Sequence, residues 1–166
     1  MRRLVLACGS ALLVLLMFSG FTSAQLRDRI RTAIEQKRGG APTAVAETKL
    51  LMNGLNQQNF EGLSRLLREK PADPVAWTFI RGQGLLIAET GNLLLLRPPR
   101  DRNAQAEWNS RSVDLRVAAT AVARAAADQD YSEARAALAD LANSCNRCHQ
   151  AFQIPQRIVP FEVKEP

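Results

Sequence analysis

Two cysteines and a histidine stand together near the end of the sequence, in the order Cys145-Asn146-Arg147-Cys148-His149. On a helix the two thiols lie on one face, within reach of the two vinyl groups along one edge of a single porphyrin. Addition of the thiols across those vinyls gives two thioether bonds, and the adjacent imidazole can then face the iron as its proximal ligand. The spacing predicts one covalently attached haem c, held by Cys145 and Cys148, with His149 bound to its iron.

Three other roles for the cysteine pair remain as alternatives. A redox-active pair of the thioredoxin type stands at the start of a helix in a βαβ context, whereas Cys145 and Cys148 come near the end of a helical pattern. A structural zinc site needs four ligands, and the sequence offers no Cys or His beyond Cys145, Cys148 and His149 once Cys8 is removed with the signal described next. A disulfide forms poorly between residues three apart on a helix.

The N-terminus has the layout of an export signal. Arg2 and Arg3 precede an apolar run over residues 4–18, and small residues ending at Ala24 form a cleavage pattern. We predict that residues 1–24 are a signal peptide and that the mature protein is periplasmic. The alternative, a membrane anchor, is less favoured because the apolar run is short for a span, so no stable anchor is expected after cleavage.

The net charge of the chain indicates less about its function than the Cys145–His149 motif does. Cleavage lowers the formal net charge from +6 to +4, because two arginines and no acidic residue are removed. We expect no nucleic-acid partner for an exported protein with so mild an excess. A positive surface would favour docking to an acidic redox partner, and an ordinary surface imbalance explains the same charge equally well.

Helical periodicity dominates the chain beyond a polar leader at residues 25–42, which we predict to be flexible or loosely helical. A first helix is expected from Thr43, weakened around Asn53 and Asn56 and restarting at Asn59. Its inward face is predicted to carry Val45, Thr48, Met52 and Leu55.

Three longer helices follow, the first from Pro74 to a stop at Pro98, the others at about 101–128 and 131–152. Asp73 and Asp101 are placed as N-caps, and Pro74 suits the first helical position. Four amphipathic helices with short connections predict an all-α fold, an antiparallel four-helix bundle over residues 43–166 whose last helix carries the haem.

Several other residues of these helices carry weaker signals. Gly82, Gly84 and Gly91 each lower helix propensity by about 1 kcal/mol relative to Ala and would let a bulky group approach the backbone. Two tryptophans are candidates for the pocket wall, although a buried tryptophan in a bundle is more often a core residue. Three arginines are candidate partners for haem propionates. These five are Trp77, Trp108, Arg97, Arg147 and Arg157.

A haem motif on the last helix of a bundle resembles the class II cytochromes c, which comprise the cytochromes c-prime and their low-spin relatives. The resemblance is carried by residues 138–152 with their motif and by the four-helix layout of residues 43–152. It implies that a residue of the first helix faces the distal side of the haem. In the low-spin members that residue is a methionine, and in the cytochromes c-prime an apolar side chain shields an open site. The resemblance also implies a possible homodimer through the first two helices.

Met52 is the only methionine left after cleavage, and it falls on the inward face of the first helix. Ligation by His149 and Met52 raises the haem potential and suits a one-electron carrier. The alternative is that Met52 only fills the core, which would leave a five-coordinate haem that binds nitric oxide or another diatomic gas. We expect no enzymatic activity, and peroxide reduction ranks last because no distal histidine or arginine can be placed.

Overall fold

The computed structural model describes residues 23–37 and 42–161. The predicted signal peptide therefore lies outside the described residues, apart from its last two. The chain divides into two units, Met1–Pro42 and Thr43–Pro166, and each is described by itself. In the first unit, α2 covers Ser23–Lys37 and so includes most of the predicted leader. None of the described helices has the length and apolar character that crossing a membrane requires.

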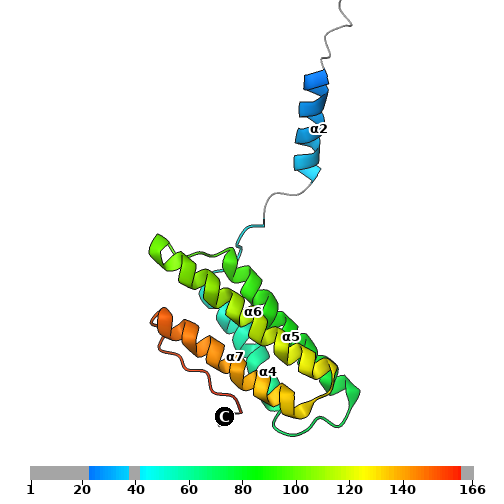
Figure 1. The fold of residues 1–166 in the computed structure, drawn as a ribbon, viewed down its shortest axis with the longest axis vertical. Coiled ribbons are helices and arrows are strands. Elements are labelled where there is room, and N and C mark those ends of the chain that lie inside the picture. The colour runs from blue at the N-terminus through cyan, green and yellow to red at the C-terminus, as the bar shows by residue number, and fades with distance from the viewer. Residues whose placement is uncertain (1–22, 38–41, 162–166) are drawn as a thin grey trace, which may run out of the picture. The chain divides into compact units, whose positions relative to one another are not determined.

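The second unit is built from helices alone over its described residues, and the predicted all-α fold is confirmed. Its first helix is continuous through α3 (Thr48–Leu51), the π-helical turn η1 (Met52–Gln57) and α4 (Gln58–Leu66). Then come α5 (Pro74–Leu95), the 3₁₀ turn η2 (Arg102–Ala104), α6 (Gln105–Ala127) and α7 (Tyr131–Ala151). Figure 1 shows the long helices side by side as a bundle.

Aspartate caps set the starts of the middle helices. Asp73 accepts hydrogen bonds from the backbone N–H groups of Val75 and Ala76 at 2.8 and 2.9 Å. Asp101 accepts one from Asn103 at 2.9 Å, and η2 intervenes before α6 begins. Both predicted caps are present because a carboxylate satisfies N–H groups that the first helical turn leaves unpaired.

The first helix differs from its prediction in two ways. It begins at Thr48 rather than Thr43, because Glu47 has the extended backbone of an N-cap, and Val45 is 96% exposed in the preceding coil. It also does not stop near Asn56. The π turn η1 carries the chain through this region, and the Asn59 side chain donates to the Leu55 carbonyl at 2.7 Å. A π turn absorbs one extra residue without ending the helix, which explains why the apolar pattern changes register there.

The closest helix packing is between α5 and α6, and it uses glycine. A methyl group on Gly91 would lie 2.7 Å from the carbonyl oxygen of Ser112, and one on Gly84 would lie 3.2 Å from that of Ala119. The same group on Gly82 would meet nothing within 4 Å. At Gly84 and Gly91 the bulky group expected near the backbone is therefore helix α6, whereas Gly82 faces open space.

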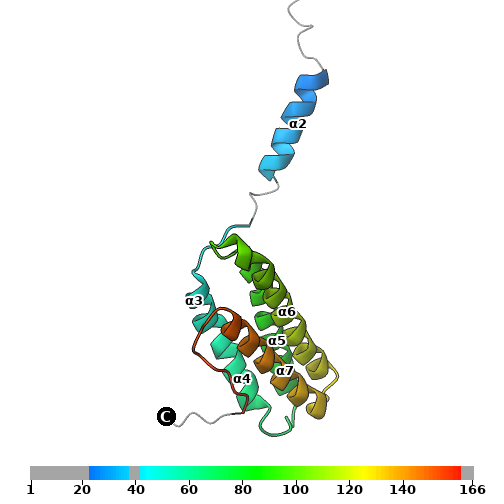
Figure 2. The same cartoon turned by 60° about the vertical axis from the view of Figure 1, so that its left-hand side comes forward.

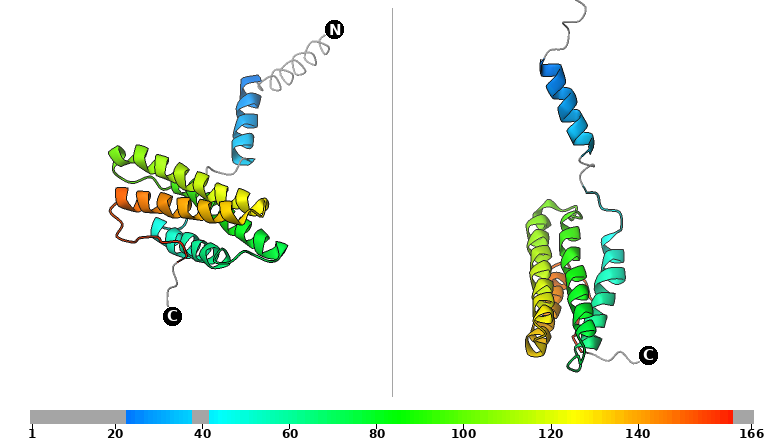
Figure 3. Two further views of the ribbon diagram at one scale, coloured as in Figure 1. Left: turned by 60° about the horizontal axis from the view of Figure 1, so that its bottom comes forward. Right: turned by 90° about the vertical axis from the view of Figure 1, so that its right-hand side faces the viewer.

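The bundle packs tightly on three of its four sides. Helix α5 packs against α4 and α6, and α6 packs against α7, around a core whose largest fully buried side chains include Leu63, Leu67, Ile80, Ile87, Val122, Leu138 and Leu141. Helices α4 and α7 do not form a comparable interface. Figures 2 and 3 show the chain after α7 turning back along this fourth side.

The reversal after α7 is a regular helix ending. Gln153 has a positive φ of 57°, the N–H of Ile154 donates to the carbonyl of His149 at 2.8 Å, and the N–H of Gln153 donates to that of Gln150 at 3.2 Å. This is the Schellman pattern, in which a left-handed residue after the helix redirects the chain. The segment that follows is consequently placed beside the motif on α7.

Candidate functional site

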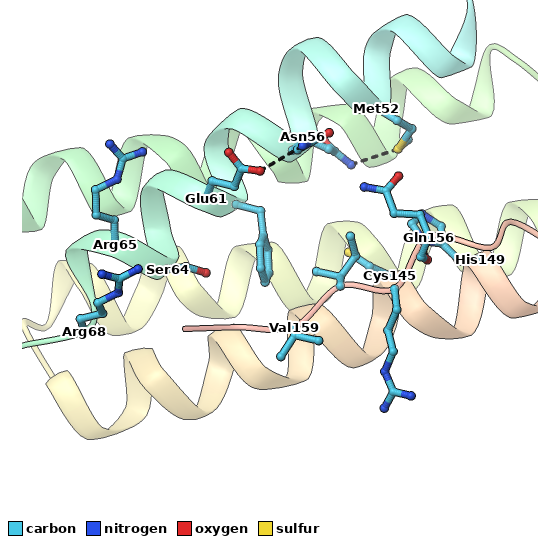
Figure 4. A pocket seen from close by; sticks show the side chains of 14 residues that line it. Met52, Asn56, Glu61, Ser64, Arg65, Arg68, Cys145, His149, Gln156 and Val159 are labelled. Atoms are coloured by element: carbon cyan, nitrogen blue, oxygen red, sulfur yellow. Dashed lines mark hydrogen bonds between the residues drawn. The ribbon is translucent and has the colours of Figure 1, made fainter. Parts of the chain in front are cut away.

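A pocket of about 370 Å³ occupies the side of the bundle between the first helix and α7, where the returning tail closes it (Figure 4). Its volume lies within the range of about 300–1,000 Å³ that is usual for small-molecule and cofactor sites. The lining residues are Met52, Asn56, Gln57, Phe60, Glu61, Ser64, Arg65 and Arg68 from the first helix and its end, Cys145 and His149 from α7, and Gln156, Arg157, Ile158 and Val159 from the tail.

His149 is held by the tail. Its Nδ1 lies 2.7 Å from the backbone carbonyl oxygen of Gln156. Because a carbonyl oxygen only accepts hydrogen bonds, the neutral imidazole carries its proton on Nδ1 in this arrangement and has a free lone pair on Nε2. A metal-binding histidine is commonly oriented by such a bond from its other ring nitrogen. His149 is therefore suited to bind a metal through Nε2.

Met52 faces the same pocket from the first helix. It is the first residue of the π turn, is half-buried, and its Sδ accepts a hydrogen bond from the Asn56 side-chain amide at 3.4 Å. In Figure 4 the Met52 and His149 side chains come from different helices at the same end of the pocket. Thioether sulfur and imidazole nitrogen are the axial ligands that occur together in cytochromes c.

The two cysteines are free thiols with different surroundings. Cys145 is half-buried and lines the pocket, and burial raises its pKa to about 12, to which the nearby Cys148 contributes. Cys148 is not part of the pocket wall. The pKa of Cys148 is raised, mainly by burial; Arg111 lowers it, and Glu107 and Asp114 raise it. These three charged residues belong to α6, so this thiol lies on the α6 side of α7. Both thiols are therefore protonated at neutral pH.

The pocket wall also carries polar groups without partners and exposed arginines. Asn56 Oδ1 and Ser64 Oγ are buried and have no hydrogen-bond partner among the described residues. Arg65 and Arg68 are exposed at the end of the pocket away from Met52, and Arg157 adds a further guanidinium from the tail. Buried polar atoms normally have partners, so these two oxygens can accept a hydrogen bond from water or from a polar group of a bound molecule.

These groups fit an iron porphyrin. Phe60, Ile158 and Val159 offer apolar wall to the macrocycle, and Met52 and His149 offer a sulfur and a nitrogen ligand. The arginines at the rim match carboxylate side chains of the kind that haem carries. Within the described part of the chain, no three His, Cys, Asp or Glu side chains converge on a point that could hold a metal ion by themselves.

Several residues considered from the sequence lie elsewhere. Trp77 is buried in the core and Trp108 donates from Nε1 to the Leu94 carbonyl at 2.8 Å, so neither lines the pocket. The Arg97 side chain donates to the carbonyls of Ala46 and Leu93 at the end of the bundle. Arg147 is exposed, so of the three candidate arginines only Arg157 reaches the pocket.

The sequence reasoning missed a stripe of pocket-lining residues along the first helix. Met52, Asn56, Phe60, Ser64 and Arg68 follow one another at steps of four residues, and all five line the pocket. Four-residue steps mark one face of a helix, so the signal was present. The expected restart at Asn59 concealed it, because it divides the stripe between two separate helices.

Comparison with protein families gives one match in this region. Residues 103–153 match the family model described as Cytochrome C'. The matched segment contains α6, α7 and the whole motif from Cys145 to His149. The match confirms the resemblance seen in the sequence and supports a c-type haem protein with covalently bound haem. Comparisons with curated proteins and with solved structures give no match.

Proposed function

We propose that this protein is an exported monohaem c-type cytochrome that carries single electrons. The proposal is supported by the match to the cytochrome c′ family, which includes helix α7 with both cysteines and His149. Cys145 and Cys148 hold one haem covalently, His149 is the proximal ligand and Met52 is the distal ligand. Bound haem iron supplies the chemistry, since it changes between the ferric and ferrous states by one electron, and His/Met ligation raises its potential.

The observation that carries this proposal is the presence of Met52 and His149 in one pocket. They are separated by almost a hundred residues of sequence, yet the bundle brings the first and last helices together around the same cavity. Each side chain also has a hydrogen-bond partner, Asn56 for the Met52 sulfur and the Gln156 carbonyl for His149. Ligands held in this way need little rearrangement between oxidation states, which favours electron transfer over substrate chemistry.

The charge around the pocket supports a docking role. Arg65 and Arg68 are exposed at the end of the pocket away from Met52. Positive groups around an exposed cofactor edge steer an oppositely charged protein into a productive encounter. We therefore include an acidic redox partner in the proposal, together with export to the periplasm by the signal at residues 1–24.

Phe60 favours a second candidate function. Its apolar side chain lines the same pocket two turns along from Met52. If Met52 does not bind the iron, an apolar group of this kind would shield an open coordination position, as in the cytochromes c-prime that the sequence resembles. The protein would then bind nitric oxide or another diatomic gas.

The optical spectrum of the purified haem-loaded protein decides between the two. A low-spin ferric spectrum with a sulfur-to-iron charge-transfer band is expected for the electron carrier. A high-spin ferric spectrum, with carbon monoxide uptake that displaces no ligand, would favour gas binding. Covalent attachment has its own measurement, since haem should stay on the polypeptide in acid acetone.

A further inference from the structure

The tail after α7 is anchored on both sides of the residue that contacts His149. On the side nearer α7, the Schellman turn at Gln153 fixes the direction in which the chain leaves the helix. On the other side, Phe161 packs against the core, and the guanidinium of Arg135 on α7 lies 3.9 Å from the centre of its ring. A short segment fixed at both ends has little freedom, so the position of the Gln156 carbonyl is determined by the fold.

Asn146 holds the middle of this segment. Its side-chain amide donates to the carbonyl of Ile158 at 2.8 Å, and its Oδ1 accepts from the N–H of Ile158 at the same distance. Both polar atoms of the amide are thus used on a single residue of the tail, in a half-buried position. Asn146 is one of the two residues between the cysteines, so the clamp and the haem attachment site share one helical turn.

We infer that residues 153–161 form a positioning strap for His149, in which the Asn146 clamp holds Ile158 so that the Gln156 carbonyl accepts the Nδ1 proton. The strap fixes the tautomer that leaves Nε2 free for the iron. It also makes the imidazole a stronger electron donor, because a hydrogen bond from the second ring nitrogen raises ligand basicity. Asn146 is therefore a positioning residue. The inference rests on the proposed function only in assuming that His149 binds iron.

A loosened strap has two separate consequences. The first is local: the N–H of Ile158 loses its acceptor and exchanges with solvent faster. Loss of one intramolecular hydrogen bond corresponds to about a tenfold change in the opening equilibrium. The second reaches the iron: a weaker bond from His149 Nδ1 to the carbonyl makes the imidazole a poorer donor, which favours the ferrous state and raises the reduction potential.

The experiment compares Asn146→Ala with Arg147→Ala in the haem-loaded protein. Arg147 is the other residue between the cysteines, is exposed, and makes no hydrogen bond to the tail among the described residues, so it controls for changes within the motif. Amide exchange at Ile158 and the reduction potential are measured for both variants. Asn146→Asp provides a second variant for the exchange measurement, because it keeps an acceptor for the Ile158 N–H and replaces the donor to its carbonyl by a charged oxygen.

We expect Asn146→Ala to exchange at Ile158 about tenfold faster than Arg147→Ala, with Asn146→Asp between them, and to have a higher potential than the unmodified protein. Unchanged amide exchange at Ile158 in Asn146→Ala would overturn the proposal that Asn146 holds the tail. Faster exchange at an unchanged reduction potential would overturn the proposed effect of the tail on His149. If the protein attaches no haem, the proposed function fails by itself. The nitrogen chemical shifts of the His149 ring then test the strap, which requires that Asn146→Ala alone loses the fixed Nδ1–H tautomer.

Discussion

The side-chain amide of Asn56 donates a hydrogen bond to the sulfur of Met52, 3.4 Å away and one turn along the same helix. The bond uses one sulfur lone pair and leaves the other available to a metal. It also draws electron density from the sulfur, which makes the thioether a weaker donor and favours the reduced state of a bound iron. From the sequence, Asn56 was expected only to weaken the helix. Its hydrogen bond would instead adjust the strength of Met52 as a ligand.

Replacement of Asn56 by Leu should lower the reduction potential of the haem-loaded protein. A hydrogen bond worth about 0.5–1 kcal/mol corresponds to about 20–40 mV for a one-electron couple. Asn53→Leu is the matched control, since Asn53 is exposed in the same π turn and does not line the pocket. Equal potentials for the two variants would contradict the assignment.

Met52→Ala should convert a low-spin spectrum into a high-spin one that takes up carbon monoxide without displacing a protein ligand. The reason is that Met52 is the only methionine from residue 25 onward and His149 is the only histidine in the sequence, so no second side chain of either type can replace the sulfur. Electronic absorption and electron paramagnetic resonance of the ferric protein measure the change. A variant that stays low-spin with its charge-transfer band intact would show that Met52 is a core residue only.

The buried thiol of Cys145 predicts an alkaline loss of stability in the protein before haem attachment. Its pKa is near 9 in the unfolded chain and about 12 in the folded one, so the unfolded state releases its proton first as the pH rises. The stabilisation is complete below pH 9 and is lost between about 9 and 12. Its full size is at most about 4 kcal/mol and is smaller to the extent that water reaches this half-buried side chain.

Urea unfolding of the haem-free protein at several pH values between 8 and 11 measures this effect. Cys145→Ser is the control, because a serine hydroxyl does not titrate in this range while other groups, such as Tyr131, are unchanged. The difference in unfolding free energy between the two proteins should shrink as the pH rises. Parallel pH profiles would be inconsistent with a raised thiol pKa.

Two glycines of α5 should respond to alanine in opposite directions. Gly91→Ala places a methyl group 2.7 Å from the Ser112 carbonyl oxygen, which forces α5 and α6 apart and should cost about 1–3 kcal/mol. Gly82→Ala meets nothing within 4 Å and should gain about 0.5–1 kcal/mol from helix propensity. Thermal unfolding of both variants measures the difference, and destabilisation of similar size would argue against the close approach at Gly91.

Local signals made most of the fold predictable from the sequence. Asp73 with Pro74 and the reversal before Tyr131 are determined by neighbours in sequence, so capping and turn rules place them well. The first helix was harder, because a π turn mixes two registers and no composition rule distinguishes it from a break. Thr43 was consequently taken as a helix start, although the helix begins five residues later.

The site divides in the same way. Cys145, Cys148 and His149 are adjacent in sequence, and their chemistry could be read directly from their spacing. The strap could not be predicted, since the bonds between Asn146 and Ile158 join residues twelve apart through a turn whose direction depends on the left-handed backbone of Gln153. Contacts of this kind depend on tertiary packing, which local sequence patterns do not reveal.

The number of residues in the π turn at Met52–Gln57 determines which side chain of the preceding helical turn faces the pocket. Each residue of a helix turns it by about 100°, so removing one residue from this turn would rotate everything before it by roughly that angle relative to α4. Met52 would then swing off the cavity wall without being mutated. If Met52 binds the iron as proposed, a one-residue deletion in this turn would therefore remove the ligand without any substitution at Met52.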